Sequence, residues 1–541
     1  MNLEILKKNL SGHVVADEEI LKKYSCDASL FEVKPSLVVF PKNLEDIKIL
    51  VNFAKDNKGV YLTARSGGTD MTGGPLGESI ILVFDKYFNK VYEVEGNSIT
   101  SEPGVYYRDF EKETLKKGLI LPSFPASREI CAIGGMVANN SGGEKTLKYG
   151  KTENYVVQIK AVLSDGNEYV FRPLNWDELR IKMEQNDFEG NIYKRLYELV
   201  KNNQEILSEA KPGVSKNSAG YALWNIWNKK NNVFDITKLF VGSQGTLGII
   251  TETTFKLVPI KKYSQLLVIM LRDLKPLANI VNSVLPHGPE SFESYDNNTF
   301  KLALKYFYSF AKLMGTKNIL KLSWEFLPEM MMVLSGIPKL VLLIELADDD
   351  SDALDKKMEA LRNSLKTFNL NMRIAKASDD INKYHAIRRE SFNLLRQKIR
   401  GKKTAPFIDD VIVNPSRLSE FLPRLNDILD DYKIIYTLAG HIGDGNFHII
   451  PLMNLKDERE RSIIKELADR VYDLVFEFGG SITAEHNDGL IRTPYLLKMF
   501  GEKVSGLFSE VKNIFDPENI FNRGKKVNGD LQYALDHIKK E

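Results

Sequence analysis

Three glycine-rich stretches lie in the first half of the chain, and they constrain its fold more than any other feature. The first, "RSGGTDMTGGPLG" (65–77), places five glycines among thirteen positions. The others are "IGGMVANNSGG" (133–143) and "GSQGTLG" (242–248). Glycine adopts positive φ angles and lets the backbone approach a ligand, so successive N–H groups can face phosphate oxygens. Three such loops predict a binding surface for a long ligand that contains a diphosphate, whereas one alone would be equally typical of a surface loop.

The two standard nucleotide-binding fingerprints are both missing from this sequence. No G-x-G-x-x-G follows a strand-like run, and no G-x-x-x-x-G-K-[ST] occurs. If the ligand is a dinucleotide, we therefore expect a fold that is not Rossmann-like.

The residues around the first glycine-rich stretch show alternating strand and helix patterns. Apolar runs predict strands over 37–40 and 60–63, and the spacing of Ile47, Leu50, Val51 and Ala54 predicts a helix between them. Asn43 is placed to cap this helix, with Asp46 three residues later. Further strands are expected over 80–84 and 98–101, and a helix over 106–117 that ends at Gly118.

The length and a change of texture predict more than one domain. A chain of 541 residues is too long for a single ordinary core. After Pro259 glycine becomes rare until Gly440, and strand-like runs (265–270, 341–345) alternate with a long helical pattern (353–368). We predict domains over 1–260 and 261–515, and a tail over 516–541 that returns to the first domain.

Composition excludes several classes of protein. The 74 basic and 72 acidic residues give a net charge of +2, which offers no global attraction for nucleic acid. The only two cysteines, Cys26 and Cys131, cannot form a disulfide framework or hold an iron–sulfur cluster. The N-terminus "MNLEILKKNL" lacks the apolar core of a signal peptide, and no apolar run is long enough to span a membrane. We expect a cytoplasmic protein, with peripheral membrane contact left open.

Five segments in order carry a specific resemblance. They are "PSLVVFPKNLEDI", "RSGGTDMTGG", "CAIGGMVANNSGGEKTLKYGKTENYV", "FVGSQGTLGIITETTFKLVP" and "FDPENIFNRGK". Together they resemble the FAD-linked oxidase family, with the FAD domain of vanillyl-alcohol oxidase and PCMH type, in the branch of D-lactate, glycolate and D-2-hydroxyglutarate dehydrogenases. The similarity extends from about residue 20 to 526. It implies an α+β fold, in which a PCMH-type FAD-binding domain of two subdomains is followed by an α+β, ferredoxin-like C-terminal cap.

The resemblance also implies which residues contact FAD. The diphosphate would be held by Ser66, Gly67, Gly68, Thr69 and Asp70. The flavin would be lined by Pro125, Ser127, Gly134, Gly135, Asn139, Ser141 and Gly142. The adenine–ribose end or the ring would meet Gly248 and Ile249, and Asn522 in the tail would close the site. Non-covalent FAD is expected, because neither 65–77 nor 133–143 contains histidine. Gln244 and Asn487 depart from the family, where Glu and Gly are common.

Two of the seven histidines flank a Gly-Asp-Gly turn in "HIGDGNFHI". His441 and His448 are an odd number of residues apart, so in one straight strand they would face opposite sides of a sheet. Gly443 and Gly445 allow a sharp turn or bulge that brings the imidazoles together. Imidazole binds zinc, iron, nickel or copper, and Glu485 could add a carboxylate ligand. A histidine pair beside a turn is, on its own, more typical of a structural hydrogen bond.

The family resemblance assigns roles to these residues. His441, His448 and Glu485 would be ligands of a divalent metal (zinc, manganese or iron), and His486 would be the general base. Arg388, in "YHAIRRESFNLLR", would bind the substrate carboxylate as a bidentate fork. A solvated basic helix face is the alternative interpretation of Arg388, and His385 stands where Trp is common in the family.

The reaction implied is oxidation of a D-2-hydroxy acid to the 2-oxo acid, with hydride transfer to flavin N5. D-Lactate is the first expectation, and D-2-hydroxyglutarate and glycolate are the alternatives. A flavin-dependent ether-lipid synthase and a non-catalytic scaffold subunit are more remote. Because two cysteines cannot carry an iron–sulfur cluster, we expect a separate electron acceptor: a quinone, a cytochrome, an electron-transferring flavoprotein or an iron–sulfur subunit.

Overall fold

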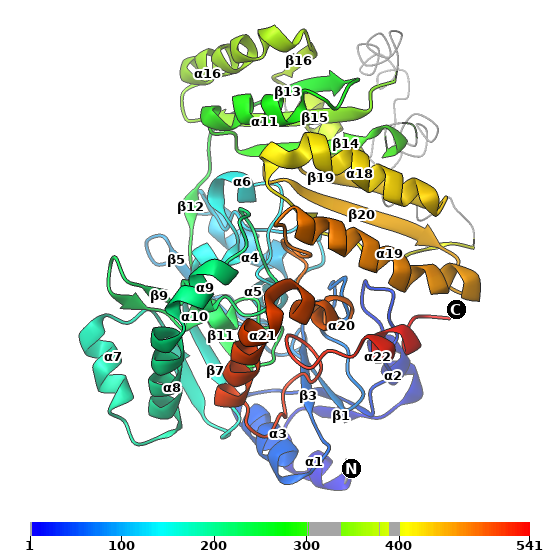
Figure 1. The fold of residues 1–541 in the computed structure, drawn as a ribbon. Helices are drawn as coiled ribbons and strands as arrows, with labels where there is room; N and C mark the ends of the chain where they lie inside the picture. The colour runs from blue at the N-terminus through cyan, green and yellow to red at the C-terminus, as the bar shows by residue number, and fades with distance from the viewer. Residues whose placement is uncertain (1–2, 300, 302–336, 378, 389–400, 541) are drawn as a thin grey trace.

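The computed structural model describes residues 3–299, 301, 337–377, 379–388 and 401–540. In Figure 1 the first half of the chain, blue to green, lies below a large sheet that the second half forms. The red C-terminal segment returns from that sheet to the lower part of the molecule. Helices and strands occur in both parts, and the sheets of the two parts are separate.

The first sheet has the order β1-β2-β4-β3, in which β2, β4 and β3 are parallel. Its strands are β1 (His13–Val15), β2 (Leu37–Phe40), β3 (Leu62–Arg65) and β4 (Ile80–Val83). Helix α3 (Leu44–Asp56) connects β2 to β3, and its buried face contains the four apolar residues predicted for it. Asn43 caps this helix by accepting a hydrogen bond from the N–H of Asp46. The strand over 37–40 and the cap are confirmed, while β3 begins two residues later than predicted.

The second sheet is antiparallel, with the order β5-β11-β7-β8. Its strands are β5 (Ser98–Ser101), β7 (Val156–Val162), β8 (Glu168–Phe171) and β11 (Ile249–Lys256). Helix α4 (Tyr107–Leu115), as predicted, and helix α8 (Phe188–Asn202) contribute large aromatic side chains to the same core. Strand β11 begins directly after the third glycine-rich stretch, so this sheet fixes the position of that loop.

Several short elements complete this half. The helices are α1 (Leu3–Asn9), α2 (Glu18–Tyr24), α6 (Thr146–Tyr149), α7 (Trp176–Met183), α9 (Gln204–Ala210) and α10 (Thr237–Phe240). Two small antiparallel pairs join β9 (Trp227–Asn228) to β10 (Val233–Phe234) and β6 (Leu119–Ile120) to β12 (Val258–Pro259).

Residues 133–139 of the second glycine-rich stretch form a helix rather than the predicted loop. Helix α5 spans Ile133–Asn139 and ends at Asn140, which has a left-handed backbone with φ 53°. A Cβ on Gly134 would lie 2.6 Å from Cβ of Pro103, and one on Gly135 would lie 3.1 Å from Oγ of Ser66. Glycine is therefore used here for close packing within a helix, and the loop prediction was wrong because it considered only backbone flexibility.

The second half forms an eight-stranded sheet with the order β16-β13-β15-β14-β19-β20-β17, and β18 pairs with β20. Its strands are β13 (Tyr263–Leu271), β14 (Ser291–Asp296), β15 (Leu340–Asp348), β16 (Asn371–Ala375), β17 (Lys403–Thr404), β18 (Val411–Ile412), β19 (Ile435–His441) and β20 (Asn446–Met453). Four helices cover one face in Figure 1: α11 (Leu277–Val284), α16 (Ser351–Ser364), α18 (Leu418–Asp431) and α19 (Glu458–Glu477). Tyr384 and Ile387, from the helical residues 379–388, pack on the opposite face. Strand β15 begins with five apolar residues (340–344), because both faces of the strand are buried there.

The C-terminal segment contacts the first half of the chain. After α20 (Gly489–Arg492) and α21 (Leu496–Phe515), Phe521 forms a parallel bridge with Leu62, the first residue of β3. Asn522 donates hydrogen bonds from Nδ2 to the carbonyl oxygens of Gly74 (2.9 Å) and Gln244 (2.6 Å). Beyond it, α22 (Leu531–Asp536) precedes a bridge between Ile538 and Phe31. The division of the chain at 260 and 516 itself stays a prediction.

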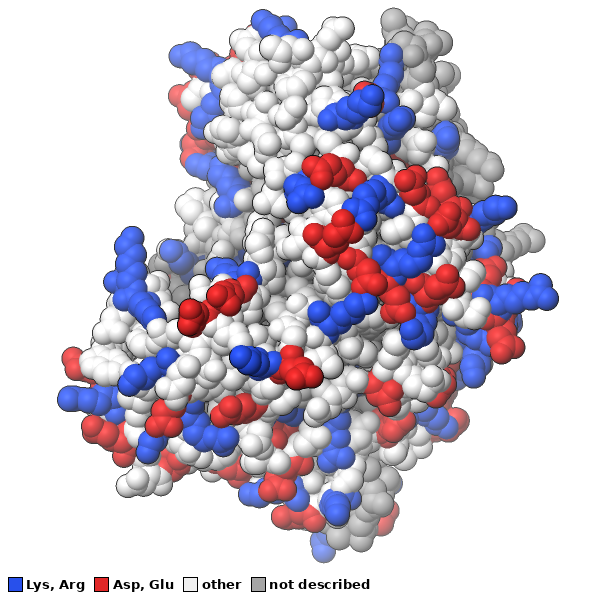
Figure 2. All heavy atoms as spheres, in the orientation of Figure 1, with Lys and Arg blue, Asp and Glu red and all other residues white. Residues whose placement is uncertain are grey.

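The face drawn in Figure 2 carries interspersed acidic and basic side chains rather than a patch of one sign. Ion pairs between partly exposed side chains join α18 to α19, through Arg424 with Glu477 (2.5 Å) and Asp431 with Arg470 (2.7 Å). None of the helices in the described part of the chain is long and apolar enough to cross a bilayer.

Candidate active site

A cavity of about 1030 Å³ lies where the two halves of the chain meet. Eighteen of the predicted residues are among those that line it. They are Ser66, Gly67, Gly68, Thr69, Asp70, Pro125, Ser127, Gly134, Gly135, Asn139, Ser141, Gly142, Gly248, Arg388, His441, His448, Glu485 and His486. The predicted cofactor-binding, catalytic and metal residues thus share one cavity, although they come from segments more than 300 positions apart.

Two predicted residues lie outside this wall. The side chain of Ile249 is fully buried in the core around the first sheet, and the next residue, Ile250, lines the cavity instead. Successive side chains of a strand face opposite sides, so the side chain of Ile249 faces away from the cavity, and its contact with FAD stays a prediction. Asn522 is 1% exposed and acts behind the wall, where it ties the first glycine-rich loop to Gln244.

One wall of the cavity is built largely from backbone. A Cβ on Gly67 would lie 2.7 Å from the carbonyl oxygen of Ile130, and Gly68 has φ +65°. The carboxylate of Asp70 accepts hydrogen bonds from the N–H groups of Thr72 (2.6 Å) and Gly74 (3.1 Å), so Asp70 closes its own loop. A side chain at Gly67 would displace the backbone at Ile130. The volume and the exposed peptide groups of this wall fit a long ligand with a diphosphate, as FAD has.

The opposite wall carries the two histidines, which a hairpin brings together. In the β19–β20 register His441 pairs with Asn446 and Ala439 pairs with His448, so both imidazoles lie on one face as diagonal neighbours. Their ring centroids are 5.3 Å apart. In the turn, Gly445 has φ +76°, and a Cβ there would lie 2.0 Å from the carbonyl oxygen of Val413. The predicted turn at Gly-Asp-Gly is confirmed.

Each of the three imidazoles is anchored at Nδ1 by a buried carboxylate. Nδ1 of His441 lies 2.7 Å from Oε1 of Glu293. Asp409 bridges the other two, with Oδ1 3.2 Å from Nδ1 of His448 and Oδ2 2.7 Å from Nδ1 of His486. A carboxylate at Nδ1 favours the tautomer with the proton there, which leaves Nε2 free to accept a proton or bind a metal.

Sequence analysis missed Glu293 and Asp409. Asp409 stands in "FIDDVIV", where two adjacent carboxylates interrupt an apolar run, and that pattern is a usable signal for buried acids with a function. Glu293 lies in "SFESYD", which carries no comparable signal.

Glu485 joins the imidazole group to a buried lysine. Its Oε2 lies 3.4 Å from Nε2 of His441, and its Oε1 lies 2.5 Å from Nζ of Lys216. Nζ of Lys216 also lies 3.2 Å from Oδ2 of Asp444. Burial opposes ionisation of Glu485, but Lys216 and His441 outweigh it and hold the pKa of this carboxyl well below its usual range. Lys216 was also missed, because one lysine in a polar segment is not informative.

The segment 483–486 is fixed by Asp410. This buried aspartate has φ +66°, and its Oδ2 accepts hydrogen bonds from the N–H groups of Glu485 (2.8 Å) and His486 (2.7 Å) and from Oγ1 of Thr483 (2.7 Å). Asn487 follows with φ 72°, a conformation that explains the glycine common in the family, and its Nδ2 donates to the carbonyl oxygen of Gly242 (2.9 Å).

Four residues of this region could hold a metal ion: Asp410, His448, Glu485 and His486 each offer one ligand atom, all within 4.8 Å of one another. This set differs from the predicted one, because it has Asp410 and His486 in place of His441. We favour His448 and Glu485, which both sets contain, as ligands. Asp410 is less suitable as a ligand, because its Oδ2 already accepts three hydrogen bonds. The predicted set of His441, His448 and Glu485 stays a prediction.

Arg388 reaches the cavity from the helical residues 379–388. Its side chain is 8% exposed, and its Nε forms an ion pair with Oε2 of Glu293 at 2.6 Å. Guanidinium has five N–H donors, so this contact leaves others for an anion. The alternative interpretation of Arg388 as part of a solvated helix face was wrong, because the residue is nearly buried.

Two family models match different parts of the chain. Residues 35–171 match the family "FAD binding domain", and residues 260–526 match "FAD linked oxidases, C-terminal domain". Among solved structures, 4-ethylphenol oxidase from Gulosibacter chungangensis has a TM-score of 0.69 at 17% identity, covering 98% of this chain and 97% of the other. An alkyldihydroxyacetonephosphate synthase has a TM-score of 0.62 at 15% identity, covering 94% of this chain and 81% of the other. These likenesses show the fold.

Curated relatives are similar over nearly the whole chain. Glycolate oxidase subunit GlcD of Bacillus subtilis is 27% identical, covering 93% of this chain and 91% of its own. D-Lactate dehydrogenase of Archaeoglobus fulgidus is also 27% identical, covering 91% of each chain. D-2-Hydroxyglutarate dehydrogenase of Escherichia coli is 24% identical over 96% of this chain, which spans only 51% of that relative's length. The expected α+β architecture is confirmed, and the chain belongs to the FAD-linked oxidases, with a PCMH-type FAD-binding domain followed by the C-terminal domain of that family.

Proposed function

We propose that this protein oxidises a D-2-hydroxy acid to the 2-oxo acid with FAD as the hydride acceptor, and that D-lactate is the preferred substrate. One observation carries the proposal: a single cavity has a wall of glycine-rich backbone and, facing it, a wall with Arg388, three imidazoles and Glu485. The D-lactate dehydrogenase of Archaeoglobus fulgidus, matched over 91% of both chains, supports D-lactate. D-2-Hydroxyglutarate and glycolate are the alternatives, since relatives named for those substrates also match.

The residues of the C-terminal wall suit the two polar groups of a 2-hydroxy acid. Arg388 binds and orients the carboxylate, and Nε2 of His486 accepts the hydroxyl proton while Asp409 holds Nδ1. His441, His448 and Glu485 would hold a divalent cation (zinc, manganese or iron), which supplies Lewis-acid polarisation of the hydroxyl group. Bound FAD, held without a covalent bond, supplies the hydride acceptor. The glycine-rich wall and the loop of Asp70 keep this acceptor opposite the imidazoles.

The charge state of His486 depends on its carboxylate neighbours. Burial lowers the pKa of His486, but the charges of Asp409 and Asp410 outweigh it and raise the pKa to about 9. In the absence of other cations this imidazole is protonated at neutral pH. Acceptance of a proton therefore requires additional positive charge near the ring, and a cation bound at His448 and Glu485 would provide it.

The test measures flavin reduction directly. Purified protein should absorb near 450 nm, and anaerobic addition of D-lactate should bleach this band, while L-lactate should not. A panel of D- and L-2-hydroxy acids then ranks D-lactate, D-2-hydroxyglutarate and glycolate. A colourless protein that cannot be reconstituted with FAD would favour the scaffold alternative. FAD-loaded protein that no hydroxy acid bleaches would favour an ether-lipid synthase, to which the structural likeness of the alkyldihydroxyacetonephosphate synthase also points.

His486→Ala tests the assignment of the base. We expect FAD to remain bound, because His486 is only one of many residues that line the cavity. Flavin reduction by D-lactate should slow by about 10²-fold or more, the usual contribution of a general base. Stopped-flow absorbance at 450 nm measures the rate. An unchanged rate of bleaching would contradict the assignment.

A further inference from the structure

A single buried glutamate contacts both the predicted anion-binding residue and one of the predicted metal ligands. Glu293 lies on β14, and its side chain is 1% exposed. One carboxylate oxygen, Oε1, lies 2.7 Å from Nδ1 of His441, and the other, Oε2, lies 2.6 Å from Nε of Arg388. Both oxygens of this carboxylate therefore have cationic or N–H partners.

The two partners of Glu293 come from different elements and meet only at the cavity. Arg388 belongs to the helical residues 379–388, and His441 is the last residue of β19. Both line the cavity, whereas Glu293 does not, so a bound substrate would contact the partners and not the glutamate. Strand β14 pairs with β19 and β15 in the centre of the large sheet, which gives Glu293 a rigid base.

We infer that Glu293 is a positioning residue that sets Arg388 and His441 relative to each other, so that the carboxylate and the hydroxyl oxygen of one 2-hydroxy acid are bound at the same time. This inference rests on the proposed function, since it assumes an anion at Arg388 and a cation at His441. The two carboxylate oxygens of Glu293 are held about 2 Å apart by one carbon atom. Each oxygen makes a short polar contact with one partner, so the fixed distance between the oxygens also restricts the distance between the guanidinium of Arg388 and the imidazole of His441.

A purely structural ion pair would have different consequences. If Glu293 only neutralises buried Arg388, its loss lowers stability and leaves the affinity for a metal ion unchanged. If it positions both partners, its loss weakens metal binding at His441 and substrate binding at Arg388, while FAD remains bound. The affinity of FAD-loaded, metal-stripped protein for Mn²⁺ or Zn²⁺ alone separates these cases without any assay of turnover.

The first test is Glu293→Gln. Glutamine carries no charge to pair with Arg388, and its single oxygen can face only one of the two partners of Glu293. We expect the affinity for Mn²⁺ or Zn²⁺ to fall by about 10- to 100-fold, the usual effect of losing a hydrogen-bond partner of a metal ligand. KM for D-lactate should also rise, with FAD content and the 450 nm band unchanged.

Glu290→Gln is the matched control. Glu290 is also 1% exposed and lies three positions earlier, but its Oε1 pairs with Nζ of Lys148 (2.7 Å), away from the residues that line the cavity. This variant should lose stability without a change in metal affinity or KM.

The second test is Arg388→Met, a substitution that leaves all of the predicted metal ligands unchanged. Arg388 also lines the cavity, so the lost charge acts on the ion directly as well as through Glu293. Arg388→Lys keeps the charge but not the guanidinium contact with Glu293, so it separates the two effects. Removal of a cation from the other side of the shared carboxylate should raise metal affinity by about threefold or more. This titration decides the question if Glu293→Gln does not fold.

The outcomes distinguish this inference from the proposed function. Wild-type protein that binds no divalent ion and is bleached by no hydroxy acid overturns the proposed function, and the positioning role with it. Wild-type protein that binds the ion and is bleached, with both variants matching its metal affinity, overturns the positioning role alone.

Discussion

At the scale of single residues, Gln244 uses both ends of its side-chain amide. Its Oε1 accepts a hydrogen bond from the N–H of Gly489 (2.9 Å), and its Nε2 lies 3.3 Å from Oγ1 of Thr72 and 3.5 Å from Oδ2 of Asp70. Gln244 is 5% exposed and links the glycine-rich loop to the C-terminal domain. An amide satisfies these partners because it has one acceptor and one donor group, and the glutamate common in the family would face Asp70 with a second carboxylate.

Gln244→Glu should therefore destabilise this chain. We expect the free energy of unfolding to fall by about 2 kcal/mol or more at pH 7, because two carboxylates would share a buried site. Burial and Asp70 would raise the pKa of the introduced carboxyl in the folded state. The destabilisation is then complete above that raised pKa and disappears as pH falls towards the unfolded value of about 4.3. Urea unfolding at pH 7 and pH 5 measures both effects, and the difference from wild type should be smaller at pH 5.

Gln532→Glu is the control for this prediction. Gln532 is exposed, and its Nε2 donates to Oδ1 of Asp536 (2.8 Å) one turn later in α22. The substitution again opposes two carboxylates, but in solvent, where like-charge pairs on a helix cost only about 0.2–0.5 kcal/mol. Equal losses in the two variants would contradict the role of burial.

The site residues divide by how far the sequence could predict them. His441, His448, Glu485, His486 and Arg388 belong to short motifs, and the structure places all five at one cavity. Their anchors lack such motifs because the contacts are long-range: Glu293 precedes His441 by 148 residues. A buried carboxylate is recognisable only when its partner is known, and no local pattern in "SFESYD" specifies that partner.

At the scale of elements, the β19–β20 hairpin decides whether two imidazoles can act together. Its four-residue turn keeps the register in which His448 opposes Ala439, so both rings lie on the face towards the cavity. A shift of one residue would turn His448 to the other face of the sheet. Gly445 is the most restricted position of the turn, because its backbone is left-handed and Val413 lies against it.

Gly445→Ala should disturb this hairpin. An alanine must adopt φ near +76°, and its Cβ would lie 2.0 Å from the carbonyl oxygen of Val413, so the turn has to move. The left-handed backbone alone costs about 1–2 kcal/mol, and the clash adds to it. We expect a loss of more than about 3 kcal/mol in the free energy of unfolding, together with weaker binding of Mn²⁺ or Zn²⁺.

The matched variant is Gly501→Ala, at the bend within α21. Gly501 has φ +74°, but no atom lies within 4 Å of the point that an alanine Cβ would occupy, so only the backbone cost applies. Thermal unfolding of both variants isolates the contribution of Val413. If Gly501→Ala is as unstable as Gly445→Ala, the clash is not the cause.

Local patterns explain which elements were predictable. Strands β2 and β5 and the cap at Asn43 follow from apolar runs and a capping residue, signals that operate within a few positions. Helix α5 was predicted as loop because Gly134 and Gly135 were expected to expose backbone to a ligand. Glycine is needed at these two positions because Pro103 and Ser66 lie against them in the folded protein, and both are distant in sequence.

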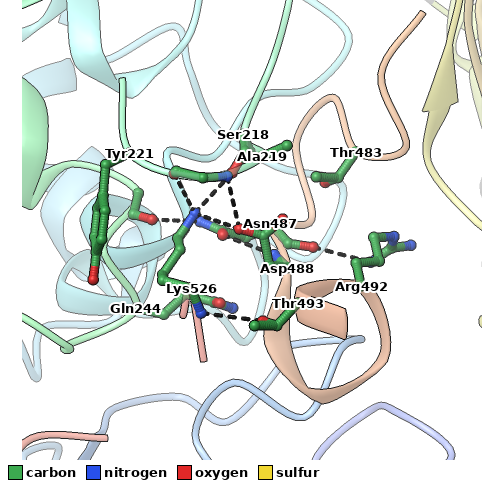
Figure 3. Close-up of polar contacts among 12 residues, drawn as sticks. Ser218, Ala219, Tyr221, Gln244, Thr483, Asn487, Asp488, Arg492, Thr493 and Lys526 are labelled. Atoms are coloured by element: carbon green, nitrogen blue, oxygen red, sulfur yellow. Dashed lines mark hydrogen bonds and ion pairs between the residues drawn. The ribbon is translucent and has the colours of Figure 1, made fainter. Parts of the chain in front are cut away.

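At the scale of the whole molecule, a buried polar cluster ties the C-terminal segment to both domains. Nζ of Lys526 donates to the carbonyl oxygens of Ser218 and Gly220, each at 2.8 Å, and to Oδ2 of Asp488 at 2.9 Å. Figure 3 shows Lys526 between the segment of Ser218 and that of Asp488. Neither Lys526 nor Asp488 has an exposed side chain. Arg492, also fully buried, donates to the carbonyl oxygens of Asn487 (3.0 Å) and Asp409 (2.6 Å), so the cluster continues to the anchors of the imidazoles.

Lys526→Met should loosen this junction. The carboxylate of Asp488 would remain buried without its cation, and an uncompensated buried charge typically costs about 3–5 kcal/mol. We expect the tail after residue 515 to become more sensitive to limited proteolysis, and thermal unfolding to become broader or to separate into two transitions, because one of the contacts that join the two halves is lost. Mass spectrometry of the fragments and differential scanning calorimetry measure these effects.

The double variant Lys526→Met with Asp488→Asn tests the cause. Asparagine at 488 keeps an oxygen that can accept from the N–H of Gly220, which now lies 2.9 Å from Oδ2 of Asp488, but it removes the charge. If the unpaired charge is responsible, the double variant should recover part of the lost stability and of the resistance to protease. A double variant only as stable as Lys526→Met would show that the unpaired charge is not the cause. The coupling of the domains would then rest on the hydrogen bonds of Lys526 to the carbonyl oxygens of Ser218 and Gly220 rather than on the ion pair.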